Sequence, residues 1–374
     1  MRLRHDPWLL ILDSNSGELR DLRQSTSRKI PPPERAVAVA KEILLFLKTM
    51  DPFYERQELP TALKIGGAWL DDLKVRRLSQ IQTYESGNVD QVVTLHENMF
   101  FNCLITGLWN FGYLQDRRVA QSALASCSHE FLATRRMWPE ISQLRVLSPV
   151  PWWGVQPDPD VAPIRFTDTW HWTQERHIAN AVSLLNLKAS GLPGFLEIGS
   201  GFGGLAERLA RRGDIDPIVL VDIPLNLVTA FYYLRRSLPD IPITLYSTRE
   251  EVIRAQTKRQ TGIHLIPSSF FTALRNWQDL SVVGNFGSFS EMDSETVAFY
   301  LAELPNSSKL LVQVNSNATV LNTGAHREVP VDNFAYPSRA VKVFESPLHS
   351  QGSGNRYKTV VHVINREESH TDLS

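Results

Sequence analysis

The sequence predicts an α/β fold, with a mainly parallel sheet over residues 164–374 and a mainly α-helical N-terminal domain over residues 1–150. Three observations support this prediction. An apolar strand, a glycine turn and a helix follow one another at 195–212; strands and helices then alternate; and the chain ends in two strands that read as an antiparallel hairpin. The segment 148–163 holds five prolines, which exclude a regular helix or a central strand, so the domain junction is expected there.

In the N-terminal part, residues 34–50 carry apolar side chains at helical spacing after a triple proline. Residues 96–114 and 118–136 are also apolar on a helical pattern. We expect these helices to pack over the sheet domain or against a second copy of the chain, which makes a homodimer plausible. Trp152 and Trp153 at the junction are expected to pack the two domains together.

In the second domain, a helix is expected at 170–187, ahead of the first strand. Proline at position 224 suits the first turn of a helix, and Asp293 suits an N-cap. The segments 243–246 and 263–266 both read as short strands, and the sequence does not decide which is the third strand of the sheet. The other strands are expected at 194–199, 218–222, 280–285, 309–314, 340–346 and 357–365, and the other helices at 203–212, 224–237 and from 294.

The glycine turn indicates a bound cofactor, because glycine has no Cβ and lets the backbone approach a ligand closely. Gly199, Gly201 and Gly204 also fit the dinucleotide pattern G-x-G-x-x-G. Glu197 lies inside the end of the strand before the turn, and Asp222 ends the next strand, where a carboxylate binds ribose hydroxyls. The position of Glu197, the long segment before the unit and the final hairpin favour S-adenosylmethionine over a dinucleotide.

Several segments resemble the sugar O-methyltransferases of bacterial polysaccharide and natural-product pathways. The similarity covers about residues 165–320, and it is carried by the segments 197–206, 221–224, 232–234, 238–240 and 288–292. The resemblance implies the class I methyltransferase fold, a Rossmann-like sheet with a C-terminal antiparallel hairpin. It also implies S-adenosylmethionine as cofactor and a hydroxyl of a sugar or glycosylated small molecule as acceptor.

Ligands of open α/β sheets bind at the C-terminal ends of the strands, so the donor site is expected there. Asp222 has an alternative interpretation as a helix N-cap, and Ser269 and Phe270 have one as part of a simple turn. The candidate cofactor-binding residues are Glu197, Gly199, Gly201, Phe202, Asp222, Ile223, Ser269, Phe270 and Asn285.

An alcohol acceptor needs a base to remove its proton. Glu291 is the first candidate, although an acid at a helix start also favours the helix dipole. His326 is the second candidate, because it lies in a long polar loop after the fifth strand that suits an acceptor pocket or lid; His171 and His264 are alternatives. Acids placed at strand ends beyond Glu197 and Asp222 are limited to Glu291 and Asp293, so the sequence does not favour a metal site but leaves metal dependence open.

Composition narrows the class further. A net charge of −1, from 39 basic and 40 acidic residues, argues against nucleic-acid binding. Cys103 and Cys127 are too few for a disulfide framework, and no run is long enough for a signal peptide or membrane span, so a cytoplasmic enzyme is expected. Three alternatives stay open: methylation of a non-sugar hydroxyl or amine, a nicotinamide-dependent oxidoreductase, and a non-catalytic scaffold.

Overall fold

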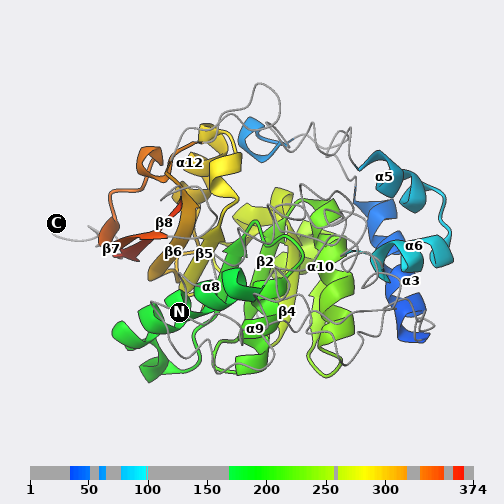
Figure 1. Ribbon diagram of the computed structural model, residues 1–374, viewed down its shortest axis with the longest axis horizontal. Coiled ribbons are helices and arrows are strands. Elements are labelled where there is room, and N and C mark those ends of the chain that lie inside the picture. Colours follow the sequence, from blue (N-terminus) through cyan, green and yellow to red (C-terminus); the bar gives the residue numbers. More distant parts are fainter. Residues whose placement is uncertain are drawn as a thin grey trace, which may run out of the picture.

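The architecture is an α/β sheet with helices on both faces, shown as a computed structural model in Figure 1. The structure describes residues 34–50, 59–64, 77–97, 99, 168–256, 260–317, 329–348 and 357–365.

Within these residues the chain forms one eight-stranded sheet of order β3-β4-β2-β1-β5-β6-β8-β7. The first six strands pair in parallel, while β8 runs antiparallel between β6 and β7. The predicted α/β class with a C-terminal antiparallel hairpin is therefore confirmed. The strands are β1 Phe195–Ile198, β2 Ile218–Asp222, β3 Ile243–Leu245, β4 Ile263–Pro267, β5 Val282–Phe286, β6 Leu310–Ser316, β7 Ala340–Leu348 and β8 Tyr357–Ile364.

Both short segments that competed for the third strand belong to the sheet. β4 pairs with β2, and β3 adds to the outer side of β4. β4 is buried along its whole length, as an inner strand must be, whereas β3 at the edge has one buried residue of three. Local apolar pattern alone could not separate these two positions, because it does not show which strand has neighbours on both sides.

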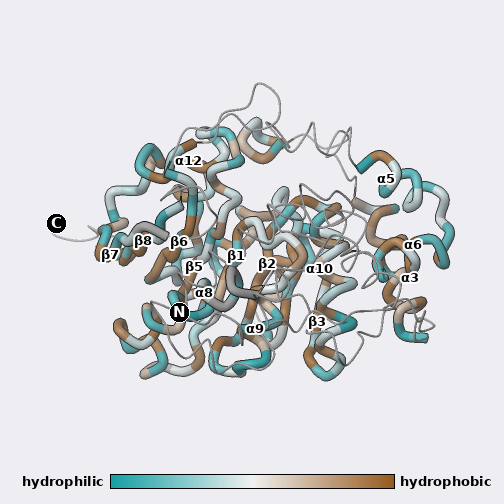
Figure 2. Tube along the Cα trace, viewed as in Figure 1, coloured by the Kyte–Doolittle hydropathy of each residue, from teal (hydrophilic) through white to brown (hydrophobic). Residues whose placement is uncertain are grey.

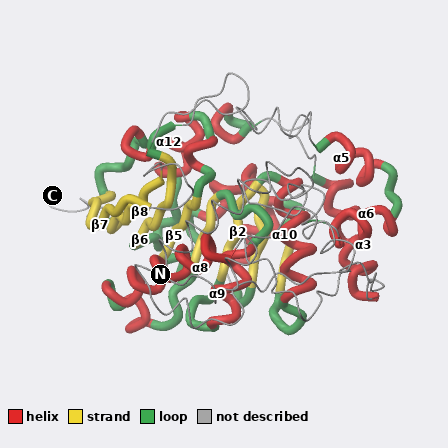
Figure 3. Tube along the Cα trace, viewed as in Figure 1, coloured by secondary structure: helices red, strands yellow, loops and turns green. Residues whose placement is uncertain are grey.

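Helices cover both faces of the sheet, as Figure 3 shows with strands in yellow and helices in red. Two hydrophobic clusters lie on the two faces. One face is covered by α8 Asp168–Leu184, α9 Gly204–Arg212 and α10 Pro224–Ser237, and the same cluster extends beyond α10 to α3 Glu34–Thr49, α5 Leu78–Glu85 and α6 Val89–Glu97. The other is covered by α11 Arg249–Gln256, α12 Ser294–Ala302 and the 3₁₀ segments η1 Thr61–Leu63, η5 Ser268–Leu274 and η7 Val331–Asn333. Two further 3₁₀ segments, η4 Leu187–Ser190 and η6 Phe289–Glu291, complete the described elements.

The outer helices are amphipathic, which explains why they pack as they do. In Figure 2, α3 and α9 alternate between brown, hydrophobic stretches and teal, hydrophilic ones. The apolar stripe faces the sheet and the polar stripe faces solvent, as the helical period requires. No helix in the described part of the chain has the length and apolar character needed to cross a membrane.

The N-terminal helices pack on α10 rather than forming a core of their own. Figure 1 shows α3 in blue and α6 in cyan beside α10, and their buried side chains join the same cluster as those of the sheet. Glu97 on α6 is buried and receives hydrogen bonds from Tyr232 Oη (2.6 Å) and Arg236 Nε (2.8 Å) on α10. Of the expected helices at 96–114 and 118–136, only residues 96, 97 and 99 are described, and α6 ends at Glu97. The tryptophans at 152 and 153 lie outside the described residues, so the domain boundary near 150 stays a prediction.

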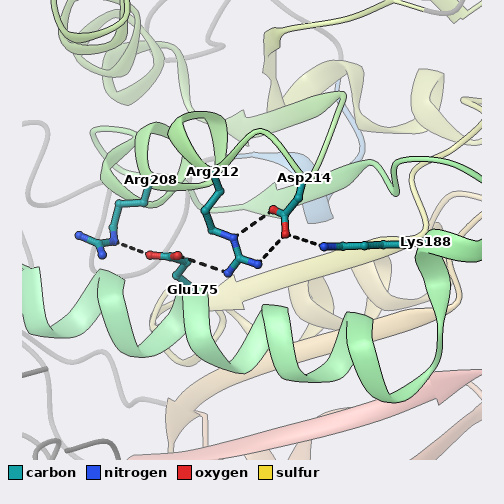
Figure 4. A network of polar contacts seen from close by, with 5 residues as sticks. All are labelled: Glu175, Lys188, Arg208, Arg212 and Asp214. Atoms are coloured by element: carbon teal, nitrogen blue, oxygen red, sulfur yellow. Dashed lines mark hydrogen bonds and ion pairs between the residues drawn. The ribbon is translucent and has the colours of Figure 1, made fainter. Parts of the chain in front are cut away.

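A chain of ion pairs holds α8 against α9, as Figure 4 shows. Glu175 on α8 accepts hydrogen bonds from Arg208 Nε (2.8 Å) and Arg212 Nη1 (3.3 Å) on α9. Arg212 continues to Asp214 (2.6 Å), which also pairs with Lys188 (2.7 Å). Because α9 begins at the glycine turn, these contacts fix α8 relative to that turn.

Candidate functional site

Three glycines in the turn between β1 and α9 differ in what surrounds them, although all three have backbone angles that favour glycine. Gly199, Gly201 and Gly203 have φ of 76°, 56° and 84°, a left-handed region that other residues rarely adopt. A Cβ at Gly199 would collide with the Ser288 side chain, and one at Gly203 would lie 3.0 Å from Leu234 Cδ1. A Cβ at Gly201 would meet nothing within 4 Å, so this part of the turn faces open space.

Two buried carboxylates lie next to this turn on the same face of the sheet. Glu197 pairs with Leu220 across the β1–β2 ladder, so Asp222 is two residues further along β2 and points to the same side. The electrostatic influence of Asp222 on Glu197 is one of the causes of the raised pKa of Glu197. The strand register therefore brings together the two acids that the sequence places 25 positions apart.

Asp222 is held by backbone and side-chain donors from the turn and from α10. Its Oδ2 accepts from the Gly201 amide (2.8 Å), and its Oδ1 accepts from the Ile223 amide (2.7 Å) and Asn226 Nδ2 (2.9 Å). Burial raises its pKa to about 6, against the effect of these hydrogen bonds and of the Arg77 charge, which lower it. Neither of the two amides is the N2 or N3 donor of α10 that an N-cap side chain binds, so Asp222 ties the turn to β2 instead.

Glu197 is buried with an oxygen that lacks a partner among the described residues. Only 4% of the residue is exposed, and Oε2 has no hydrogen bond there. Burial, and secondarily the charge of Asp222, raise the pKa of Glu197 well above its ordinary value. A buried acceptor of this kind is costly unless a ligand or water donates to it.

Two more predicted residues follow the end of β4, at the same end of the sheet. Pro267 pairs with Asp222, so the η5 segment begins directly beside the second carboxylate. Ser269 is buried, its Oγ has no partner among the described residues, and Phe270 next to it is half-buried. Ile223 is also half-buried, at the start of α10. Residues at or just after the ends of β1, β2 and β4 thus lie together at the carboxyl end of the sheet.

Asn285 at the end of β5 hydrogen bonds within the protein. It is fully buried; its Nδ2 donates to Ile198 O (2.8 Å) and Ser288 Oγ (2.6 Å), and its Oδ1 accepts from the Phe289 amide and Asn315 Nδ2. These bonds connect the ends of β1, β5 and β6. The geometry thus favours a role for Asn285 in holding these strand ends together. Its predicted contact with a cofactor stays a prediction.

Phe202 lies in the turn, between α8 and α10. Its ring makes edge contacts with His171 (5.4 Å between ring centroids) and Tyr233 (4.9 Å). It is 4% exposed, so its visible role is to pack α8 and α10 over the turn. His171 therefore contacts the glycine turn itself and lies at the start of α8.

Glu291 is the last residue of η6, the segment that follows β5. Ser288, just before η6, donates to Ile198 O (3.1 Å) at the end of β1, and Glu291 itself is half-buried. The Val329 amide donates to Ser290 O (3.0 Å), so the chain returns to η6 after the long polar loop. His326 in that loop lies outside the described residues.

His264 is placed away from these groups. It lies in the middle of β4, 2% exposed, with Nδ1 bonded to Tyr246 Oη (2.9 Å) and its ring against Trp277. Its neighbours Tyr246 and Trp277 belong to the cluster on the opposite face of the sheet. This histidine packs the core, and burial lowers its pKa to about 4.

The described residues contain no group of three or more His, Cys, Asp or Glu side chains placed to hold a metal ion.

Sequence reasoning missed two residues near the second carboxylate: Asn226, which donates to Asp222, and Arg77, which donates to Asn226. Asn226 follows Asp222 by four positions, a spacing that signals a side-chain pair at a helix start, but Arg77 carries no local signal.

The fold is that of the class I methyltransferases. The parallel strands, the glycine turn after β1 and the antiparallel β8 between β6 and β7 give this arrangement. No protein-family model and no curated protein matches the chain.

Solved structures show weak overall similarity. Magnesium protoporphyrin IX methyltransferase from Synechocystis PCC 6803, with bound S-adenosylhomocysteine, is 13% identical (TM-score 0.34), over 65% of this chain and 99% of that one. The N-methyltransferase NodS from Bradyrhizobium japonicum WM9 is 14% identical (TM-score 0.34), over 51% and 86%. TrmK of M. capricolum is 14% identical (TM-score 0.31), over 48% of this chain and 66% of that one. Similarity at this level does not assign a function, so the proposal below is argued from the site.

Proposed function

We propose that this chain is an S-adenosylmethionine-dependent O-methyltransferase that acts on a hydroxyl of a sugar or glycosylated small molecule. The observation that carries the donor assignment is the pair Glu197 and Asp222, buried side by side next to a turn whose Gly201 faces open space. An adenosine-type ligand needs both features, carboxylates for its hydroxyls and backbone that permits close approach.

The residues present fit this cofactor. Asp222 would hold the ribose hydroxyls, and the partnerless Glu197 Oε2 would accept a hydroxyl or ammonium hydrogen of the ligand. Ser269 Oγ, also buried without a partner among the described residues, and the half-buried Phe270 and Ile223 would face the adenine. The cofactor supplies a methyl group on a positively charged sulfur, which makes that carbon reactive toward an oxygen nucleophile.

The chain's own contribution to the reaction is to position the acceptor and remove its proton. Ser288, the residue before η6, donates to Ile198 O at the end of β1, and Glu291 follows it by three positions. We assign to Glu291 the role of general base, with His326 as the second candidate. The acceptor assignment rests on the resemblance of the segments around 197 and 288 to sugar O-methyltransferases; a non-sugar hydroxyl or amine is the alternative.

Calorimetric titration with S-adenosylhomocysteine, with NADH in parallel, tests the donor assignment. We expect S-adenosylhomocysteine alone to bind. Gly201→Val should abolish that binding without unfolding the protein, because its side chain would occupy the open space above the turn. Gly213→Val is the matched control: Gly213 also has positive φ (70°) and open surroundings, but it follows the far end of α9.

Two outcomes would contradict the donor assignment. Binding of NADH instead of S-adenosylhomocysteine would indicate an oxidoreductase. Equal binding by the parent and Gly201→Val would place the ligand elsewhere. If Gly213→Val loses binding to the same extent, backbone strain rather than blocked space would explain the effect.

Glu291→Gln tests the base assignment once an acceptor is in hand. We expect unchanged affinity for S-adenosylhomocysteine and a transfer rate lowered by about 10²–10⁴-fold, the usual contribution of a general base. Glu295→Gln, an exposed acid one turn later, is the control. A fully active Glu291→Gln variant would move the base role to another residue.

A further inference from the structure

We propose that Arg77, far from the sheet in the sequence, is a positioning residue for the donor site and acts on Asp222 through Asn226. This inference rests on the proposed function, because it assigns a role within the site that holds the donor. It goes further by making the N-terminal helices part of that site.

The relay consists of two hydrogen bonds in the protein interior. Arg77 Nη1 donates to Asn226 Oδ1 (3.0 Å), and Asn226 Nδ2 donates to Asp222 Oδ1 (2.9 Å). The exposed fractions are 4% for Arg77, 6% for Asn226 and 9% for Asp222. Arg77 is the N-cap residue of α5, while Asn226 lies in the first turn of α10.

The chemistry of an amide explains why the relay needs arginine at its far end. Asn226 has one end that accepts and one that donates, so its oxygen suits a protonated Asp222 and its nitrogen an ionised one. A guanidinium can only donate, so it requires the Asn226 oxygen to face Arg77. The amide nitrogen is then directed at Asp222, where a carboxylate needs a donor.

The positive charge of Arg77 also affects the protonation state of Asp222. That charge favours the ionised form of Asp222, which burial disfavours. Among the described residues, Glu197 on β1 also lies near Asp222, and burial together with the charge of Asp222 raises the pKa of Glu197; Tyr84 on α5 is influenced by the same Arg77 charge. An ionised carboxylate accepts ribose hydroxyls more strongly than a protonated one, so Arg77 supports donor binding at neutral pH.

The test compares Arg77→Met with Arg236→Met in the full chain. Both arginines attach N-terminal helices to α10, but Arg236 pairs with Glu97 and not with the Asp222 relay. We expect Arg77→Met to weaken S-adenosylhomocysteine binding about tenfold at neutral pH, the size of one hydrogen bond to a charged group. We also expect the loss of affinity on acidification to begin at higher pH than in the parent. Arg236→Met should keep the parental pH profile.

Two further variants separate positioning from general packing. Arg77→Lys retains a buried donor and charge and should restore most of the affinity. Asn226→Ala breaks the same relay without removing a charge, and its effect should not add to that of Arg77→Met in the double variant. Circular dichroism of each variant verifies that it is folded before titration.

The results of these titrations show whether Arg77 positions Asp222 for donor binding or only packs the helices. Parental affinity and pH profile in Arg77→Met, or additive losses with Asn226→Ala, would overturn the inference. Equal losses in Arg77→Met and Arg236→Met without a pH shift would also overturn it, because packing alone would explain them. If the parent chain fails to bind S-adenosylhomocysteine at all, the proposed function falls, and the role of Arg77 falls with it.

Discussion

Glu197 occupies a position that a folded chain without a ligand does not favour. Its carboxylate is buried, has an oxygen without a partner among the described residues, and lies beside Asp222, so the ionised form is penalised twice. A residue placed at such a cost is typical of a site that serves a ligand rather than stability.

The raised pKa of Glu197 predicts how stability depends on pH. The pKa of Glu197 is higher in the folded state than in the unfolded state. The contribution of Glu197 to the free energy of unfolding is therefore fully present below the unfolded-state pKa, and it is lost as pH rises through the folded-state pKa. We therefore expect Glu197→Gln to become progressively more stable relative to the parent as pH rises above about 4.3, where an unfolded Glu ionises, measured by urea unfolding.

The control for this prediction is Glu295→Gln, which also removes one acid but at an exposed position. Its stability relative to the parent should change little over the same pH range. A constant difference between Glu197→Gln and the parent at every pH would show that the charge of Glu197 is not penalised in the fold.

At the scale of elements, α8 is the component that closes the turn from one side. His171 at its start contacts the Phe202 ring, and Glu175 one turn later binds two arginines of α9 (Figure 4). The position of α8 therefore depends on partly buried ion pairs as well as on its apolar stripe. The loss of one partner in such a pair leaves the other desolvated, which is more destabilising than the loss of a surface pair.

Glu175→Ala tests this dependence. The side chains of Glu175 and Arg208 are 12% and 15% exposed, so we expect the free energy of unfolding to fall by about 1–3 kcal/mol. Lys188→Ala, which removes the 47% exposed end of the same network, should lower it by less than about 1 kcal/mol. Urea unfolding monitored by circular dichroism measures both; equal losses would mean that Glu175 contributes only as a surface charge.

At the scale of the whole molecule, the N-terminal helices and the sheet share one core. Buried residues of α3, α5 and α6 belong to the same cluster as those of β1, β2 and α10. Polar contacts cross the same interface at Glu97, at Arg77 and at Arg35, whose Nη2 donates to Pro239 O (3.0 Å). The expectation that these helices pack over the sheet domain agrees with this arrangement, while the alternative of a second copy is not tested by it.

The sequence determined the order of the strands and most of their bounds, but the helices α5, α6 and α11 were not predicted. β2 and α10 lie at the predicted residues, and β1, α9 and β6 differ by one or two positions at their ends. This was possible because burial on both faces of a parallel strand produces an unbroken apolar run, and glycine or proline marks the boundaries. Glu197, the glycine turn and Asp222 were found for the same reason, since each has a fixed place relative to a strand end.

Tertiary structure alone decided the position of β3 and β4 in the sheet, the inward role of Asn285 and the relay from Arg77. Asn285 reads from the sequence as a site residue because it ends a strand, and that role stays a prediction. Its hydrogen bonds to Ile198, Ser288, Phe289 and Asn315 are visible only in the folded chain. Arg77 and Asp222 are joined only because Arg77, at the start of α5, reaches Asn226 on α10. Contacts of this kind depend on which surfaces meet after the elements form, and neither periodicity nor local spacing carries that information.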